Sequence, residues 1–241
     1  MEQARALQEC LRADGLEAGV YVGMRNWHPF IRETMARMQS DGAERIVAMC
    51  LAPQYSKMSV GQYFRRTQEA RQELEMKVEL LWTKTFHDHP LLIEAFAEKL
   101  DPFPKSTKVL FTAHSLPVRI LENGDPYDTE ARATARQVAA RDGLENWDFA
   151  YQSQGMTDEQ WLGPTVESRI EQFSAEGVRE VVLAPVGFVC DHVEILYDID
   201  VLFRACADQR GIRLHRTESL NDSPTFIAAL AAVAGEKLRA T

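Results

Sequence analysis

The chain has 241 residues, of which 45% are hydrophobic and 26% charged, and its 27 basic and 36 acidic side chains give a formal net charge of −9. This composition is typical of a globular protein with one or two domains and excludes a disordered chain. An acidic chain lacks the broad basic surface that nucleic-acid binding requires, so we expect no nucleic-acid partner.

Membrane and metal-cluster classes are also disfavoured. The longest apolar run, Val181–Cys190, contains a proline and a glycine and is much shorter than the roughly 20 residues of a membrane-spanning helix. The first residues match no secretory signal, so we expect a cytoplasmic protein without a transmembrane segment. The four cysteines form no C-x-x-C pair, and we predict reduced thiols, no iron–sulfur cluster and no resident cofactor.

Short β-branched runs alternate with longer amphipathic ones, which predicts repeated β–α units and parallel sheets. In chain order we expect a helix at 3–11, a strand at 19–23, a helix at 30–39, a strand at 45–51, a helix at 60–74, a strand at 78–82, a helix at 90–100, a strand at 108–113, a helix at 127–141, a strand at 146–151, a helix at 166–173, a strand at 180–185, a helix at 193–209, a strand at 212–215 and a helix after Pro224.

Two prolines and small polar residues at 100–106 separate two β/α sets of similar size, and we place the domain boundary there. The first half is residues 1–103, and we expect the helix 223–241 to complete it. The second half is residues 104–222. The first half opens with a helix, as if an initial strand and loop were absent, so we expect its sheet to be incomplete at the N-terminal side.

Candidate functional side chains follow two of the predicted strands. His114 follows the strand 108–113, and Glu194 lies in the segment after the strand 180–185. Ligands of open parallel sheets bind beyond the carboxyl ends of the strands, so both residues are expected at one rim. An imidazole and a carboxylate can bind a transition metal or move protons. Asp198 shares a helical face with Glu194, whereas His192 does not, and we interpret His192 as structural.

Other enzyme classes lack their motifs. No G-x-G-x-x-G, G-x-x-x-x-G-K-[ST] or G-x-S-x-G pattern occurs in the chain. Dinucleotide, P-loop and serine-hydrolase chemistry are therefore disfavoured.

Ordered motifs along nearly the whole chain resemble ferrochelatase. They are Tyr21–Phe30 (YVGMRNWHPF), Leu51–Ser56 (LAPQYS), Phe111–Pro117 (FTAHSLP), Tyr151–Gly155 (YQSQG), Trp161–Pro164 (WLGP) and Pro185–Asp200 (PVGFVCDHVEILYDID). The resemblance implies two Rossmann-like halves and insertion of Fe²⁺ into a porphyrin, protoporphyrin IX or coproporphyrin III, to make haem. His114 and Glu194 match the pair credited with iron binding and pyrrole deprotonation, in either division of the two roles.

The resemblance also implies substrate contacts. Tyr63 matches a porphyrin-contacting tyrosine, and Ser115 follows the matched histidine directly. Trp161, Phe188 and Tyr197 are candidates for an apolar slot around the macrocycle. Four basic residues are candidates to meet propionates, although surface solvation is the more common role for each: Arg25, Lys57, Arg65 and Arg66.

Two departures from the family pattern lead to alternatives. The glycine-rich first strand and loop of the family have no counterpart, and Leu202 stands where some relatives continue an acidic line beyond Asp198. We therefore keep two other interpretations: a noncatalytic tetrapyrrole- or metal-binding fragment, and a related cobalt chelatase. The family's C-terminal cysteine cluster, which holds an iron–sulfur centre in some relatives, is not found here.

Overall fold

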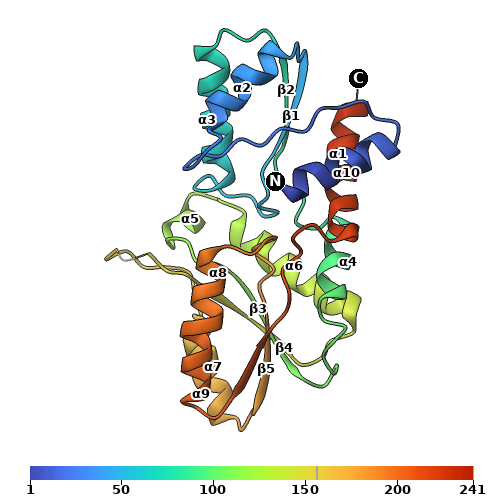
Figure 1. Cartoon of the computed structure of the whole chain (residues 1–241). Coiled ribbons are helices and arrows are strands. Elements are labelled where there is room, and N and C mark those ends of the chain that lie inside the picture. The colour runs from blue at the N-terminus through green and yellow to red at the C-terminus, as the bar shows by residue number, and fades with distance from the viewer. Residues whose placement is uncertain (156, 241) are drawn as a thin grey trace. The chain divides into compact units, whose positions relative to one another are not determined.

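The computed structural model describes residues 1–155 and 157–240. The chain divides into two compact units, one made of residues 1–86 with 222–240 and the other of residues 87–221 (Figure 1). The last helix groups with the first unit. The division lies at Phe86/His87 rather than at 103/104, because α4 (Pro90–Glu98) packs against α6 (Tyr127–Asp142) of the second unit.

The first unit is built on two parallel strands, β1 (Arg45–Met49) and β2 (Glu79–Thr83). Its helices are α1 (Glu2–Ala13), α2 (Ile31–Ser40), α3 (Val60–Glu73) and α10 (Pro224–Arg239). Helices α2 and α3 pack together over a core that includes Ile46 and Val78, while α10 contacts both strands and α1. The C-terminal helix is therefore an integral part of this unit.

The expected strand at 19–23 is not formed. Its backbone bonds to side chains of two helices: the Val20 amide donates to Gln8 Oε1 at 2.7 Å, and Thr34 Oγ1 donates to the Val22 carbonyl at 2.7 Å. The segment is thus held by α1 and α2. Its short apolar, β-branched run predicted a strand, but such a local run does not supply a pairing partner.

The second unit has a four-stranded parallel sheet in the order β4-β3-β5-β6. The strands are β3 (Lys108–His114), β4 (Trp147–Gln152), β5 (Glu180–Ala184) and β6 (Arg213–Arg216). The remaining helical elements are α5 (Arg119–Glu122), which the sequence did not predict, α7 (Val166–Ala175), α8 (Val193–Tyr197), the π-helix η1 (Asp198–Phe203) and α9 (Arg204–Asp208). The predicted α/β fold with parallel sheets flanked by helices is confirmed.

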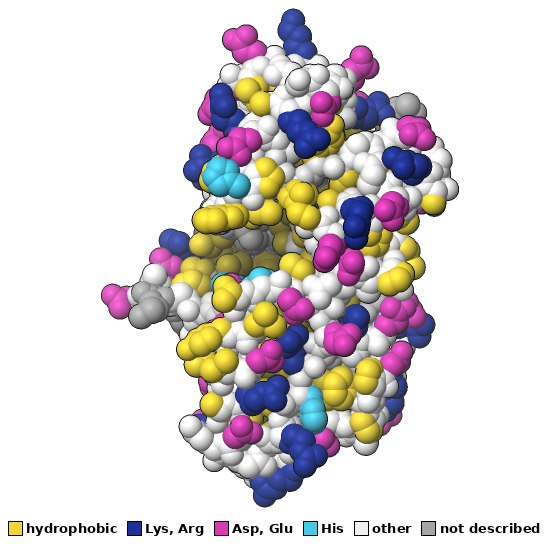
Figure 2. All heavy atoms as spheres, viewed as in Figure 1, with side chains coloured by type: hydrophobic (Ala, Val, Ile, Leu, Met, Phe, Trp, Pro, Cys, Tyr) yellow, Lys and Arg dark blue, Asp and Glu magenta, His cyan; other side chains and the backbone are white. Residues whose placement is uncertain are grey.

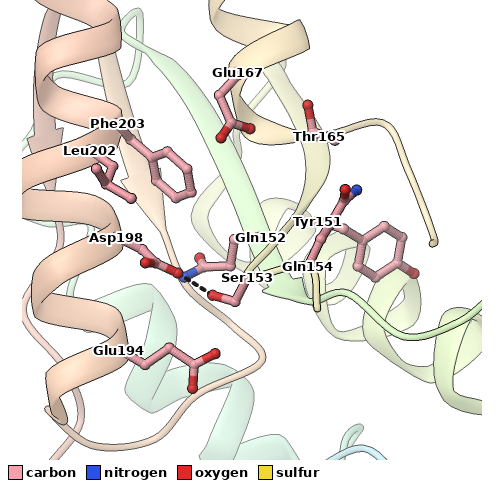
Figure 3. Close-up of a pocket in the computed structure, with 10 residues that line it drawn as sticks. All are labelled: Tyr151, Gln152, Ser153, Gln154, Thr165, Glu167, Glu194, Asp198, Leu202 and Phe203. Atoms are coloured by element: carbon pink, nitrogen blue, oxygen red, sulfur yellow. Dashed lines mark hydrogen bonds between the residues drawn. The ribbon is translucent and has the colours of Figure 1, made fainter. Parts of the chain in front are cut away.

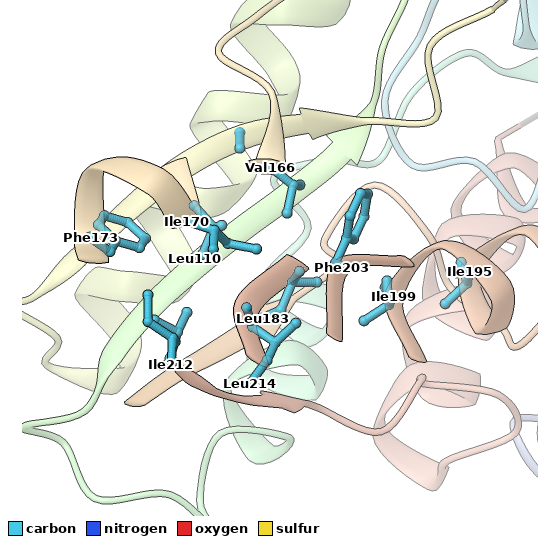
Figure 4. Close-up of a cluster of buried hydrophobic side chains, with 13 residues drawn as sticks. Leu110, Val166, Ile170, Phe173, Leu183, Ile195, Ile199, Phe203, Ile212 and Leu214 are labelled. Atoms are coloured by element: carbon cyan, nitrogen blue, oxygen red, sulfur yellow. The ribbon is translucent and has the colours of Figure 1, made fainter. Parts of the chain in front are cut away.

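The core of this unit lies between the sheet and the layer formed by α7, α8, η1 and α9 (Figure 4). Leu110 of β3 belongs to it, and because side chains alternate along a strand, Thr112 and His114 point to the same face. Helix α6 packs against β4 and α4. The strand period therefore aims His114 toward the helices that follow β5.

The expected helix at 193–209 contains a π turn. Its buried residues Ile195, Ile199, Phe203 and Ala207 recur every four positions. In a regular α-helix a four-residue step rotates about 40° past a full turn, so this stripe would leave the core. The wider π turn at η1 offsets that rotation. It also keeps Glu194, Asp198 and Leu202 in one line, since they share the same spacing.

No helix in residues 1–155 or 157–240 combines the length and the hydropathy that a membrane span needs.

Gly187 sets the approach of the loop after β5 to the end of β3. A Cβ at this position would lie 2.7 Å from both Cα and Cβ of Ala113. We predict that Gly187→Ala lowers the free energy of unfolding by about 1–3 kcal/mol, because backbone must move. Urea denaturation measures this, with Gly163→Ala as control, since its nearest contact would be 3.8 Å. Equal stability of the two variants would contradict the prediction.

Candidate active site

Three hydrogen bonds hold the end of β3, at His114 and Ser115. The Tyr127 hydroxyl donates to the His114 carbonyl at 2.8 Å, and the Ser115 amide donates to the Gln152 carbonyl at 2.7 Å. The side chain of Ser115 is fully buried, and its hydroxyl donates to the Leu162 carbonyl at 2.8 Å. Ser115 therefore anchors this loop from within the core, and its expected substrate contact stays a prediction.

The structure brings His114 and Glu194 together. Glu194 lies in the first turn of α8, directly after the loop from β5, the strand that pairs with β3. The His114 Nε2 and Glu194 Oε1 atoms are 3.0 Å apart, with about 35% and 42% of the side chains exposed. The His114 Nδ1 faces the Ser115 carbonyl, which can only accept a hydrogen bond. Nδ1 therefore carries a proton, and Nε2 is the nitrogen free to exchange one.

This pair shifts both titrations. Burial lowers the pKa of His114, but hydrogen bonds to Glu194 and to the Ser115 carbonyl, with the charges of Glu194 and Asp198, outweigh it and raise the pKa overall. The hydrogen bond from His114 is the main cause of the lowered pKa of Glu194. Each partner thus favours the charged form of the other: the carboxylate favours the imidazolium, and the imidazolium favours the carboxylate. Burial lowers the pKa of the neighbouring His192.

A pocket of about 380 Å³ opens beside Glu194 in the second unit (Figure 3). It is lined by Tyr151, Gln152, Ser153, Gln154, Thr165, Glu167, Glu194, Asp198, Leu202 and Phe203. The Ser153 hydroxyl donates a hydrogen bond to Asp198 Oδ2, and Glu167 extends into view from α7 on the opposite wall. Along the line Glu194, Asp198, Leu202, the third position is apolar and carries no carboxylate. Glu167 of α7 supplies a further carboxylate to the pocket.

The pocket is negatively charged. Three carboxylates and no lysine or arginine occur among these lining residues, so their field favours a cation. Within residues 1–155 and 157–240, no group of three or more histidine, cysteine or acidic residues is arranged as a preformed metal site.

The expected aromatic residues of this unit have different environments. The ring of Phe188 lies 6.2 Å from that of His114 and 5.4 Å from that of His192. Hydrophobic side chains gather over the helix that begins at α8 (Figure 2), where Tyr197 is 54% exposed. Trp161 lies against Gly155, where a Cβ would come within 2.4 Å of the indole. Phe188 is thus adjacent to the His114–Glu194 pair, and Tyr197 presents an apolar surface on the same helix as Glu194.

The remaining candidates lie in the first unit. Tyr63 packs from α3 against that unit's core, and the Arg25 guanidinium lies over its ring, 5.2 Å from the centroid. Arg65 and Arg66 both pair with Glu69, so neither cation is dedicated to a ligand. Lys57 precedes α3 and its backbone carbonyl accepts a hydrogen bond from Gln62.

Sequence reasoning missed several lining residues. Gln152 ends β4, and Ser153 and Gln154 follow it, so the rule that selected His114 also applies to them. Glu167 could not be found this way, because it lies on α7 and reaches the pocket only through helix packing.

Solved structures with similar folds include a protein described as the sirohydrochlorin chelatase SirB. The structure titled "SirB from Bacillus subtilis with Fe3+" matches with a TM-score of 0.75 at 10% identity, covering 99% of this chain and 89% of that one. The structure of CbiX, described as the terminal enzyme of sirohaem biosynthesis in denitrifying bacteria, matches with a TM-score of 0.59 at 13% identity, covering 99% of this chain and 90% of that one. The chain therefore has the chelatase fold.

Sequence similarity is more specific than the fold. A ferrochelatase family profile matches residues 1–238. Ferrochelatase of Acidobacterium capsulatum is 46% identical over 97% of this chain and 77% of its own length. Coproporphyrin III ferrochelatase of Geobacillus kaustophilus is 36% identical over 96% of this chain and 77% of its own length. The chain belongs to the ferrochelatase family, and the expected ferrochelatase enzyme of haem biosynthesis is confirmed.

We predict that Glu194→Gln lowers the pKa of His114 in the metal-free protein. In the native chain the carboxylate raises this pKa above 6.5 against the opposing effect of burial, so removing the negative charge shifts the balance back. NMR titration of the imidazole measures the midpoint. The Glu218→Gln variant is the control, since that side chain is 88% exposed and pairs with Lys99. An unchanged midpoint in Glu194→Gln would contradict the assignment of the pair.

Proposed function

We propose that this chain inserts Fe²⁺ into a porphyrin with His114 and Glu194 as catalytic residues and with Asp198 as a further metal-binding residue. The 3.0 Å His114–Glu194 pair beside an acidic pocket carries the proposal, and membership of the ferrochelatase family supports the reaction. No cofactor beyond the Fe²⁺ substrate is included.

Insertion exchanges one dication for two protons. Each of two pyrrole N–H groups must lose a proton as two iron–nitrogen bonds replace the N–H bonds. His114 Nε2 accepts a proton in its neutral form, because Nδ1 is committed to the Ser115 carbonyl. Glu194 stabilises the imidazolium that forms and takes the proton on toward water, so that the second proton can follow.

The carboxylates handle the metal. Hydrated Fe²⁺ is attracted to the acidic pocket, where Asp198 and Glu194 replace part of its water shell. Because the described residues offer no preformed cage of three or more such ligands, the ion is not trapped and can pass to the porphyrin nitrogens. Glu194 belongs to both the metal line and the proton pair, so it couples arrival of the ion to release of the shared proton.

Four aromatic residues are proposed as porphyrin contacts. Phe188, beside His114, and the exposed Tyr197 offer apolar surface near the reacting pair. Tyr63 and Trp161 are proposed to contact the macrocycle edges. Arg25, over the ring of Tyr63, is the basic residue best placed to accompany that contact.

We predict that His114→Ala and Glu194→Gln each lower kcat by about 10²–10⁴-fold, because each removes a proton-transfer group. The assay is anaerobic Fe²⁺ insertion followed by loss of the free-porphyrin spectrum. His215→Ala is a matched control, since it removes another histidine that pairs with a glutamate in this unit, Glu180, at 2.9 Å. Retained insertion in both site variants would disprove the catalytic assignment.

We predict that Asp198→Asn raises the KM for Fe²⁺ by about tenfold and changes the KM for porphyrin little, because it removes a charge from the metal route. The same assay with each substrate varied in turn separates the two constants. A rise confined to the porphyrin KM would place Asp198 outside the metal route.

The preferred porphyrin and metal are tested together. Protoporphyrin IX and coproporphyrin III are compared in parallel, with Fe²⁺ and Co²⁺ in direct competition. We expect insertion of Fe²⁺ well above the uncatalysed rate, and the faster porphyrin identifies the pathway. Preference for Co²⁺ would favour a cobalt chelatase, and tight porphyrin binding without insertion would favour a noncatalytic binder.

A further inference from the structure

The segment that carries Glu194 and Asp198 has weak local support. Helix α8 spans only Val193–Tyr197 and has no side-chain cap at its start. A π-helix follows it directly, and π geometry is rarely stable without tertiary contacts. Something outside this segment must therefore hold the two carboxylates in place.

One arginine bonds to both sides of the segment. Arg216 Nε and Nη2 donate to the two carboxylate oxygens of Asp200 at 3.1 Å each, and Arg216 Nη1 donates to Asp191 Oδ1 at 3.4 Å. Asp191 precedes Glu194 by three residues, and Asp200 follows Asp198 by two. The guanidinium group is rigid and planar, and only 17% of the Arg216 side chain is exposed. It therefore fixes the positions of Asp191 and Asp200 relative to each other.

Sheet order explains this placement. Arg216 ends β6, which pairs with β5, and the loop after β5 leads to Glu194. Arg216 shares the strand face of Leu214, which packs in the core beneath η1. The arginine therefore emerges beside the segment it binds.

Residues after β6 strengthen the Asp191 end. Ser219 Oγ donates to Asp191 Oδ1 at 2.8 Å, and Asn221 Nδ2 donates to Asp191 Oδ2 at 2.9 Å. In return the Asp191 amide donates to Asn221 Oδ1 at 3.0 Å, and the Asn221 amide donates to the Val189 carbonyl at 2.9 Å. The loop before Glu194 is thus bonded to the loop after β6.

We propose that Arg216 is a positioning residue for metal insertion, whose guanidinium joins Asp191 to Asp200 and so holds Glu194 and Asp198 against His114. We call Arg216, Asp191 and Asp200 the Arg216 clamp. The proposal rests on the proposed function for its catalytic consequence, but the clamp itself is a structural statement that can be measured without substrate.

Hydrogen–deuterium exchange tests the clamp directly. In Arg216→Gln we expect amides of residues 193–203 to exchange about tenfold faster. Local opening of this segment then no longer requires breaking the hydrogen bonds from the guanidinium to the two carboxylates. Arg204→Gln is the matched control, because Arg204 also reaches Asp200, at 3.8 Å, but its side chain is 51% exposed. Unchanged exchange in Arg216→Gln, or an equal rise in Arg204→Gln, would overturn the proposal.

Kinetics test its consequence. Per folded molecule, Arg216→Gln should lose about 10- to 100-fold in kcat through misplacement of Glu194, with the dissociation constant for porphyrin unchanged within about twofold. Arg216→Lys should recover part of the loss, because a lysine keeps the charge without the fork. Asp191→Asn should cost less in the Arg216→Gln background than in the native chain, because the contact between these two residues is already lost there. A kcat equal to that of the native chain would refute positioning.

Two further outcomes remain interpretable. If Arg216→Gln does not fold, Arg216→Lys and Asp191→Asn carry the exchange and kinetic tests. If the native chain inserts no metal, the proposed function fails, whereas faster exchange in Arg216→Gln alone would still support the clamp.

Discussion

The parallel pairing of β3 with β5 is the constraint on which the site depends. It places the end of β3, with His114, beside the loop that leads from β5 to Glu194. Because side chains alternate along a strand, His114 points to the face that α8 covers. The same sheet extends to β6 on the other side of β5, which brings Arg216 to the far end of the same loop. The strand order β3-β5-β6 thus determines both the position of the His114–Glu194 pair and the position of Arg216.

The helix after this loop shows how packing and function share a spacing. Burial of Ile195, Ile199 and Phe203 at intervals of four requires a turn wider than an α-helix provides. The π turn that results aligns Glu194, Asp198 and Leu202 along the pocket. Packing of the core therefore imposes π-helical backbone, which is less stable than an α-helix, on the segment that carries the site carboxylates. The ion pairs of Arg216 with Asp191 and Asp200 offset that loss of stability.

Charge at the site is arranged in two zones. The His114–Glu194 pair lies at the end of β3, and Asp198 and Glu167 extend negative charge away from it. Glu194 belongs to both zones, so one carboxylate faces the opposing demands of binding a cation and moving a proton. This dual position is the structural basis for the proposed role of Glu194 in coupling metal arrival to proton loss.

Sequence by itself determined the alternation of strands and helices, the identity of His114, Glu194 and Asp198 as candidates, and the family. Hydrophobic period, proline and glycine positions and ordered motifs are local signals, and they need no knowledge of what lies across the fold. Tertiary structure alone decided that residues 19–23 remain unpaired, that α4 belongs with the second unit, that Ser115 is buried, and that Glu167 and Arg216 reach the segment of Glu194. Each of these depends on contacts between residues distant in the chain, which no local pattern encodes.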